Sequence, residues 1–335
     1  MKVWVVGGAG YIGSHVCKAL RKAGHTPVIF DNLSSGLRKN LPEDAIFRQG
    51  DIQDPEALKK AAQEFPFDGV VHLAALKAAG ESMLVPELYS RQNITGTLNL
   101  LQAVLEAGIP RFVFSSTAAV YGSPEYLPLD EKHPTNPENY YGYTKLMIEG
   151  FLEWYGRLKG LKHVRLRYFN AAGYDPDGEI QGLEQNPGNL LPVVMETAMG
   201  WRKQLQIFGD NYSTRDGTCI RDYVHVSDLA SAHVSALEHL MKGGENLTLN
   251  LGTGSGITVK EMVDKAMEIT GRKIPFEVVG RRLGDPASVT ASSEMALAKL
   301  GWTAKYSDAE TLLRTTWKTY QSNGPDRYFE LNPRS

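Results

Sequence analysis

The chain has 335 residues, of which 42% are hydrophobic and 22% are charged, as in an ordinary globular protein. Its net charge of −2 gives no electrostatic basis for binding nucleic acid or an anionic membrane. Two cysteines, Cys17 and Cys219, are too few for a disulfide framework, so we expect packing residues in a reducing, cytoplasmic setting. The sequence predicts neither a membrane span nor a signal peptide. The length predicts one large domain with a smaller one.

The first half of the chain alternates short apolar runs with helical patterns. The runs predicted as buried parallel strands are Val3–Val6, Pro27–Phe30, Ala45–Arg48, Gly69–Leu73, Phe112–Ser115 and His163–Tyr168. The predicted helices between them are Ile12–Ala23, Pro55–Glu64, Glu87–Ala107 and Tyr140–Leu158. This alternation indicates right-handed βαβ units and an α/β fold with a doubly wound parallel sheet of the Rossmann type.

The second half has a different texture. Residues 175–188 are rich in Gly, Pro and acidic side chains and indicate a long surface loop. The strands predicted in this half are Leu205–Phe208, Leu247–Leu251 and Phe276–Val279, and the helices are Val226–Leu240, Val259–Thr270 and Ser307–Tyr320. We therefore expect a nucleotide-binding domain over residues 1–170, to which residues from about 210 to 250 return, and a smaller α/β substrate lobe mainly over residues 171–335.

A glycine turn lies between the first predicted strand and the first predicted helix. Gly8, Gly10 and Gly13 form a GxGxxG pattern, and Gly7 precedes it. In this context Gly8 permits a tight turn, Gly10 permits close approach of a pyrophosphate, and Gly13 permits close helix packing. Free N–H groups at the helix start would bind the pyrophosphate. The alternative is a glycine-rich turn without a ligand, but the strand–turn–helix context favours a dinucleotide.

Carboxylates end the next two predicted strands. Asp31 follows Gly13 by 18 residues, near the spacing of about 20 at which a carboxylate accepts hydrogen bonds from the adenosine ribose. A carboxylate there would repel a 2′-phosphate, so NAD is favoured over NADP. Asp51, followed by Ile52, could bind the adenine amino group or could be an ordinary loop carboxylate.

Three tyrosines, Tyr140, Tyr141 and Tyr143, precede Lys145 at a predicted helix start. Because residues four apart share a helix face, the spacing selects Tyr141 as the neighbour of Lys145. A phenol must lose about three pKa units, roughly 4 kcal/mol, to act as a base at neutral pH. One ammonium at about 4 Å supplies that order of energy, but desolvation opposes it, so a second cation such as an oxidised nicotinamide would help. The alternative is a chance surface pair.

Hydroxyl groups follow a strand just before this helix. Ser115, Ser116 and Thr117 come directly after the apolar run of residues 112–114. A hydroxyl at this position could bind a substrate oxygen and relay its proton.

The motifs extend over nearly the whole chain and include "HLAALKAAGES", "SSTAAVYG", "YYGYTK", "RYFNAAG", "GNLLP" and "RRLGD". With them, the chain resembles the extended short-chain dehydrogenase/reductase family and, within it, the UDP-glucose 4-epimerases. The resemblance implies reversible C4 epimerisation of a UDP-hexose through a 4-keto sugar, with tightly bound NAD. It also implies a homodimer formed through the helices Glu87–Ala107 and Tyr140–Leu158, and it implies neither a nucleic acid nor a membrane partner.

The resemblance also implies roles for individual residues. The catalytic ones are Tyr141, Lys145 and Thr117, where threonine stands in place of the family's usual serine. The implied NAD contacts are Gly7, Gly10, Tyr11, Ile12, Gly13, Asp31, Asn32, Ser34, Asp51, Ile52, Leu73, Ala74, Ala75, Lys77, Asn93, Ser115, Tyr141, Lys145 and Phe169. The implied UDP-sugar contacts are Thr117, Tyr141, Asn170, Asn189, Leu190, Phe208, Arg221, Tyr223, Arg282 and Asp285.

Two residue patterns bear on the substrate. Arg221 and Arg282 could clamp a diphosphate by bidentate hydrogen bonds, although either arginine alone could form a surface salt bridge. Val289, within a register error of one residue, stands where many relatives carry an aromatic residue or cysteine. A smaller side chain there would leave room for an N-acetyl group, so we expect that UDP-GlcNAc and UDP-GalNAc could also be accepted.

Three alternatives remain at this point. A nucleotide-sugar 4,6-dehydratase, or a decarboxylase of the same family, also begins with C4 oxidation. Dehydratases need an acid and a base after the threonine, where this chain has Ala118 and Ala119. A UDP-glucuronate 4-epimerase is not excluded. A non-catalytic NAD sensor would tend to lose the pair of Tyr141 and Lys145.

Overall fold

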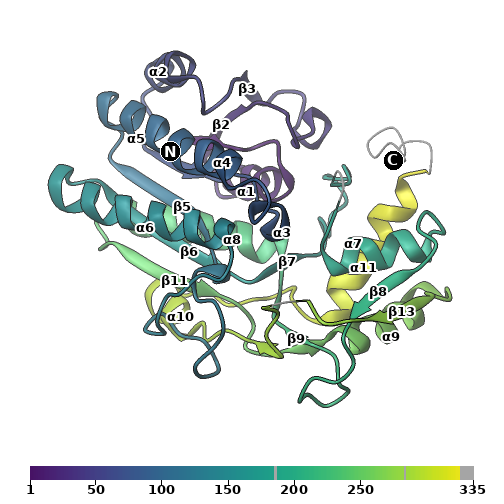
Figure 1. Ribbon diagram of the computed structural model, residues 1–335. Helices are drawn as coiled ribbons and strands as arrows, with labels where there is room; N and C mark the ends of the chain where they lie inside the picture. The colour runs from purple at the N-terminus through teal and green to yellow at the C-terminus, as the bar shows by residue number, and fades with distance from the viewer. Residues whose placement is uncertain (185–186, 283, 325–335) are drawn as a thin grey trace.

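The main sheet of the protein has seven parallel strands in the order β11-β6-β5-β4-β1-β2-β3 (Figure 1). The computed structural model describes residues 1–184, 187–282 and 284–324. The strands are β1 Lys2–Val6, β2 Thr26–Asp31, β3 Ile46–Gln49, β4 Gly69–His72, β5 Arg111–Thr117, β6 Lys162–Tyr168 and β11 Leu247–Leu251. The predicted α/β class with a doubly wound sheet is confirmed.

Side chains from both faces of this sheet are buried, which explains why its strands have continuous apolar runs. Along β1, Val3 and Val5 belong to one core, while Trp4 and Val6 belong to another. Successive side chains of a strand point to opposite faces, so each strand contributes to both cores. Helices must therefore cover both faces of the sheet.

The helices that pack on the sheet form two layers. The first core contains residues of α1 and α8, and the second contains residues of α2, α5 and α6. Their bounds are α1 Tyr11–Lys22, α2 Pro55–Glu64, α5 Gly96–Glu106, α6 Tyr140–Lys159 and α8 Val226–Met241. The helix predicted over Glu87–Ala107 is divided into α4 Pro86–Tyr89, a π-helical segment Ser90–Thr95, and α5. These three segments follow one another without a break, so the predicted helix is confirmed, and the π-helical stretch within it is the feature that was not predicted.

The strand order reverses direction between β1 and β4. From β1 the chain proceeds outward through β2 and β3, then returns to β4 and proceeds the other way through β5, β6 and β11. Loops that leave adjacent strands in opposite directions open a crevice at the carboxyl ends of the strands, where ligands bind in this class of sheet. The glycine turn after β1 lies at this point.

A second lobe gathers around its own core, at the lower right of Figure 1. It contains α7 Leu190–Ala198, α9 Val259–Thr270, α11 Ala309–Ser322 and the parallel pair of β8 Leu205–Phe208 and β13 Phe276–Val279. Short strands connect it to the main sheet: β7 Asn170–Ala172 pairs with β10 Tyr223–His225, and β9 Ile220–Arg221 lies between β12 Ile257–Thr258 and β14 Ser288–Val289. The remaining helical segments are α3 Ala79–Ser82, α10 Glu294–Leu300, and the 3₁₀ turns Arg38–Asn40 and Ala118–Val120.

The prediction of a surface loop over residues 175–188 needs correction, because part of this loop is buried. Asp175, Ile180 and Leu183 are buried, because this segment packs between the glycine-turn helix and the second lobe. Residues 185–186 lie outside the described part of the chain. Cys17 and Cys219 are both buried free thiols, as expected. Among the described residues, none of the helices has the length and apolar character to cross a membrane.

Candidate functional site

The glycine turn brings three backbone segments into close contact. Gly7 has a positive φ of 86°, and a Cβ there would lie 2.5 Å from the backbone nitrogen of Ala74. A Cβ on Gly13 would lie 2.1 Å from the carbonyl oxygen of Gly7, so helix α1 can approach the turn only without a side chain. Gly10 is the N-cap of α1, and no side chain caps its free N–H groups. These groups could hold an anion at the switch point of the sheet.

Asp31 holds the neighbouring loop in place. Its Oδ2 accepts from the Ala9 N–H at 2.9 Å, and its Oδ1 accepts from the Leu33 N–H at 2.8 Å. Burial raises the pKa of Asp31, and these backbone hydrogen bonds oppose the rise. Because a carboxylate has about four acceptor positions, and the Gly10 N–H also donates to it, acceptor capacity remains for a ribose hydroxyl group.

The predicted adenosine contacts lie beside one another after β2 and β3. Asn32 donates to Asp51 Oδ2 at 2.9 Å, and its own Oδ1 accepts from the Ser34 N–H at 2.9 Å. Asp51 Oδ1 accepts from the Gln53 N–H at 2.8 Å, and Ile52 is buried. Asp51 therefore shapes this loop, whatever it binds.

The segment Leu73–Lys77 follows β4 and lines the other side of the crevice. The N–H groups of Leu73 and Ala74 both donate to Val6, which fixes the segment to β1. Asn93, in the π-helical segment, accepts from the Leu76 N–H at 2.8 Å and donates to its carbonyl at 3.0 Å. Asn93 is fully buried, and because both bonds join it to Leu76, it holds the loop after β4 in place. Ala75 is partly exposed on it, and Lys77 pairs with Glu184.

Helix α6 brings Tyr141 and Lys145 to the end of β5. Its N-cap Asn139 accepts from the Gly142 N–H at 2.8 Å, so the helix begins directly before the tyrosines. Lys145 Nζ lies 5.9 Å from the centroid of the Tyr141 ring. Tyr140 instead bonds the Ser90 hydroxyl, and Tyr143 is exposed. The structure thus brings Tyr141 alone of the three close to Lys145.

The electrostatics of this pair differ from the expectation. Burial raises the pKa of Tyr141, and a hydrogen bond to Thr117 opposes the rise. Burial lowers the pKa of Lys145 to about 7, and the charge of Glu149 opposes that fall. A half-charged ammonium cannot offset the desolvation of the phenol. In the protein alone, burial therefore raises the pKa of Tyr141 rather than lowering it, which gives the expected second cation more to do.

Of the three hydroxyls that end β5, Thr117 is the one beside Tyr141. Its Oγ1 also accepts from the Ala119 N–H at 3.2 Å. The adjacent alanines add no acid or base.

The two serines have other partners. Ser115 Oγ and His233 Nε2 are 2.8 Å apart, and Ser116 Oγ donates to Glu149 at 2.5 Å. Ser115 nevertheless contributes to the site, because its carbonyl accepts from Lys145 Nζ at 2.9 Å. Its hydroxyl already has a partner in His233, and its role as a cofactor contact stays a prediction.

An apolar cluster lies next to this group. Phe169 packs in it with Tyr121, and Ala118 and Val289 are partly buried against it. Val289, the position at which many relatives carry a different residue, therefore belongs to the same apolar cluster as Phe169.

The two arginines of the predicted diphosphate clamp both contact groups of the protein, and the clamp itself stays a prediction. Arg221, on β9, forms an ion pair with Asp285, and its Nη1 donates to the Ile220 carbonyl at 2.7 Å. The Arg282 guanidinium lies 3.7 Å from the centroid of the Phe208 ring. The two arginines therefore each have a partner in the protein, and Asp285 offsets the charge of one of them.

The other predicted sugar contacts lie between the two lobes. Asn170 donates to the Asp222 carbonyl at 2.9 Å, and Tyr223 is buried beside it in β10. Asn189 is the N-cap of α7 without a capping side-chain bond, and Leu190 packs on the core of the second lobe. The Asn189 side chain thus makes no cap bond to its own helix.

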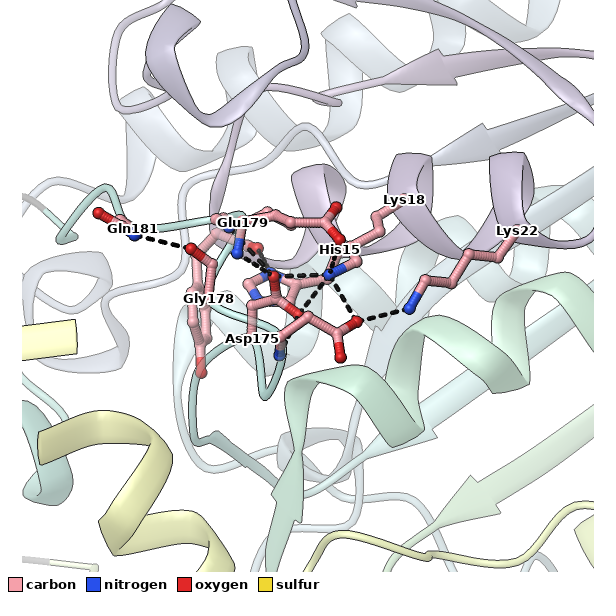
Figure 2. A network of polar contacts seen from close by, with 10 residues as sticks. His15, Lys18, Lys22, Asp175, Gly178, Glu179 and Gln181 are labelled. Atoms are coloured by element: carbon pink, nitrogen blue, oxygen red, sulfur yellow. Dashed lines mark hydrogen bonds and ion pairs between the residues drawn. The ribbon is translucent and has the colours of Figure 1, made fainter. Parts of the chain in front are cut away.

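A network that the sequence analysis missed joins α1 to the segment after β7. Lys18 Nζ bonds Asp175 at 2.7 Å and Asp177 at 2.9 Å, and Lys22 also reaches Asp177 (Figure 2). The Tyr11 hydroxyl donates to the Gly173 carbonyl. The available signal was the spacing of the two lysines on one helix face and the acidic run "DPDGE". Ile12, also predicted as a cofactor contact, is half-buried against the first core.

Comparisons with known proteins agree with this geometry. The model of the NAD dependent epimerase/dehydratase family matches residues 3–252. The chain is 46% identical to the UDP-glucose 4-epimerase of Halalkalibacterium halodurans over 324 residues, which span 96% of each protein. It is 44% identical to the structure of UDP-glucose 4-epimerase from Brucella ovis in complex with NAD, with a TM-score of 0.93 over 95% of this chain and 98% of that one. The enzyme from Bifidobacterium longum, in complex with NAD+ and UDP, is 33% identical, with a TM-score of 0.91 over 98% of this chain and 100% of that one. The chain belongs to the NAD dependent epimerase/dehydratase family.

Proposed function

We propose that the protein catalyses the reversible inversion at C4 of UDP-glucose and UDP-galactose, with NAD held at the glycine turn. The observation that carries the proposal is the convergence of Tyr141, Lys145 and Thr117 at the carboxyl end of β5, in the same sheet whose β1 leads into a turn that only glycine can form. Relatives named UDP-glucose 4-epimerase at 42–46% identity support it.

The residues of the site fit this cofactor. The free N–H groups at the start of α1 suit the pyrophosphate, and Asp31 has acceptor capacity for a ribose. NAD supplies the group that accepts hydride from C4 and returns it, and its positive charge is the second cation that Tyr141 requires. Lys145 and Asp31 hold it from the two ends of the crevice.

The proton steps belong to Tyr141. Its phenolate removes the O4 proton as C4 is oxidised, and Thr117 bonds the same oxygen. The resulting 4-keto sugar turns about its UDP anchor, near Arg221 and Arg282, and presents its other face. Tyr141 then returns the proton, and the C4 configuration is inverted. Ala118 and Ala119 offer no carboxylate for elimination, so a 4,6-dehydratase lacks its acid and base.

Product analysis tests this function. The purified protein is incubated with UDP-galactose without added NAD, and the sugar nucleotides are separated. Formation of UDP-glucose is the expected result, because the cofactor is regenerated in each cycle. Bound NAD without turnover would instead indicate the non-catalytic sensor.

Acceptance of N-acetylated sugars is a second part of the proposal. Val289 pairs with Arg221 across β14 and β9 and packs on the wall that contains Phe169. A small side chain there leaves space beside the hexose. We expect turnover of UDP-GalNAc, which Val289→Tyr should abolish while UDP-galactose turnover is retained. Absence of UDP-GalNAc turnover in the native protein would contradict this part.

A homodimer through α5 and α6 is the third part. Trp154 and Leu158, one turn apart on α6, are 58% and 70% exposed, which is unusual for large apolar side chains. Leu158→Glu should yield monomers in sedimentation velocity. Leu297→Glu, an equally drastic change on α10, should not. The buried free thiols Cys17 and Cys219 fit a reducing, cytoplasmic setting.

A further inference from the structure

A buried polar network lies behind the catalytic group. Its centre is Glu149 on α6, which is 2% exposed. Glu149 Oε1 accepts from Ser116 Oγ at 2.5 Å and from Arg167 Nε at 2.9 Å, and Oε2 accepts from Arg167 Nη2 at 2.5 Å. The carboxylate is thus fixed by two adjacent strands, β5 and β6.

The network continues to the next strand and beyond. Arg167 Nη1 donates to the Tyr121 hydroxyl at 3.0 Å, and that hydroxyl donates to Asn250 Oδ1 at 2.7 Å. Asn250 Nδ2 donates to the Leu129 carbonyl at 3.1 Å. All of these groups are buried, so Arg167 cannot leave Glu149 without breaking further bonds.

Stability does not account for this arrangement. Burying a carboxylate and a guanidinium costs desolvation energy that their attraction often fails to recover, and apolar residues of the same size are often better. Glu149 and Arg167 occupy a core that otherwise contains apolar side chains such as Ile148 and Leu152. A role in the neighbouring site is the simpler explanation.

The network contacts that site through β5. Lys145 Nζ bonds the carbonyl of Ser115, and the next residue, Ser116, bonds Glu149. Glu149 also follows Lys145 by four residues, so both project from one face of α6. Successive residues of one strand therefore hold the ammonium and the carboxylate.

We propose that Glu149, fixed by Ser116 and Arg167, is a positioning residue that favours the charged form of Lys145 and directs it at the cofactor and Tyr141. This inference rests on the proposed function for its catalytic meaning, but the charge on Lys145 can be measured without turnover.

The other titratable groups around the pair do not supply the same effect. His72 on β4 is neutral, since burial lowers its pKa to about 3. Arg165 on β6 donates to the Glu149 carbonyl at 3.3 Å and carries the same sign of charge as Lys145. Arg167, also on β6, pairs with the Glu149 carboxylate and offsets part of its charge. Further neighbours are the phenols of Tyr141, Tyr168 and Tyr89, whose pKa values burial raises. Glu149 is the carboxylate whose charge opposes the loss of the Lys145 proton.

The test follows the proton on Lys145 by NMR. The full-length protein is labelled with ¹³Cε-lysine, and the Lys145 resonance is assigned by its absence in Lys145→Arg. We expect Glu149→Gln to lower the pKa of Lys145 by about one unit or more, a tenfold change in its protonation. Glu153→Gln is the matched control, because it removes a half-exposed carboxylate one turn further along α6 and should leave the titration unchanged.

The outcomes are separable. An unchanged Lys145 titration in folded Glu149→Gln overturns the inference. If that variant does not fold, Glu149→Asp takes its place, because it withdraws the carboxylate by one methylene. The inference then requires a smaller decrease in the pKa of Lys145, and an unchanged pKa overturns it. In turnover assays, the alkaline limb of the kcat/KM profile should move to lower pH in Glu149→Gln. A shifted titration in a protein whose native form has no epimerase turnover would reject the proposed function and leave the inference intact.

Discussion

In the proposed mechanism Tyr141 meets two opposing demands, since it is buried next to substrate and must also lose a proton. Burial raises its pKa, and Lys145 is itself partly neutral because burial lowers its pKa to about 7. The base therefore depends on a bound cation, which couples proton removal to occupancy by oxidised cofactor. A protein without that cofactor would keep Tyr141 protonated and inert.

Replacing Tyr141 by phenylalanine removes the proton acceptor and keeps the ring. We expect turnover to fall by about 10³-fold or more, in line with loss of a general base, while NAD content and UDP affinity are retained. Steady-state kinetics and cofactor release by denaturation measure the two effects. Tyr143→Phe, at an exposed ring on the same helix, is the control, and native turnover in Tyr141→Phe would reject the assignment.

Two variants of Thr117 separate the contribution of its hydroxyl to turnover from the contribution of its methyl group. Thr117→Ser keeps the hydrogen bond to Tyr141 and should retain turnover within about tenfold, whereas Thr117→Val should lose about 10²-fold or more. The measurement is kcat for both variants with UDP-galactose. Equal activity of the valine and serine variants would mean that the hydroxyl has no part in the reaction.

Single residues were predictable where local spacing decides their position. The four-residue interval selected Tyr141, and the apolar run before it placed Thr117 at a strand end. The pairing of Arg221 with Asp285 was not predictable, since it depends on β9 and β14 meeting across a long stretch of chain. The partners of the Ser115 hydroxyl and of Asn93 were missed for the same reason.

At the scale of elements, the structure joins the cofactor helix to the segment that leads into the second lobe. Lys18 is 14% exposed and Asp175 is 2% exposed, whereas Lys22 and Asp177 are about half exposed. The ion pair of Lys18 and Asp175 is therefore shielded from solvent and salt, whereas the ion pair of Lys22 and Asp177 is not. The two lysines of α1 make a matched comparison.

Lys18→Met should destabilise the fold, because it leaves the Asp175 carboxylate without its cation. We expect a loss of about 2–3 kcal/mol in the free energy of unfolding, against about 0–1 kcal/mol for Lys22→Met. Urea denaturation of both variants measures the difference. Equal losses would show that the ion pair of Lys18 and Asp175 has no more effect than a surface ion pair.

Elements were predictable in proportion to their length and periodicity. The bounds of α2, α9, β8, β11 and β13 agree with the sequence patterns. Strands of two or three residues, such as β7 and β9, give no period-two signal and were missed. The helix predicted over residues 87–107 is present, but its π-helical segment was not predicted, because Asn93 turns inward there to hold a loop that no local pattern reveals.

At the scale of the whole molecule, five histidines are buried in neutral form. Burial lowers the pKa of His72 to about 3 and that of the others to about 4: His15, His163, His225 and His233. In the unfolded chain these groups would bind protons below about pH 6.5. The unfolded state therefore gains protons that the folded state cannot take up.

Stability should consequently be independent of these groups above about pH 6.5 and fall as the pH decreases from there toward 4. Each histidine contributes up to about 1.4 kcal/mol per pH unit in that window. Urea denaturation at pH 8, 7, 6 and 5 measures the free energy of unfolding. A flat profile between pH 6.5 and 5 would contradict the burial of these neutral rings.

The class of the sheet was predictable from the alternation of strands and helices. The position of its last strand, β11, within the sheet was not. The pattern of β11 identifies a strand, and nothing local says that it lies beside β6. The division into domains at residue 170 stays a prediction, since the described structure shares one sheet between early and late segments.

The position of β11 at the edge of the sheet has a consequence for synthesis on the ribosome. Until residue 251 has emerged, β6 is the outermost strand on its side and has unpaired backbone groups. Its sequence KHVRLRY places Arg165 and Arg167 along that temporary edge, and charged side chains disfavour pairing with other nascent chains. The same arginines that later face Glu149 thus reduce the risk of aggregation while the protein is still incomplete.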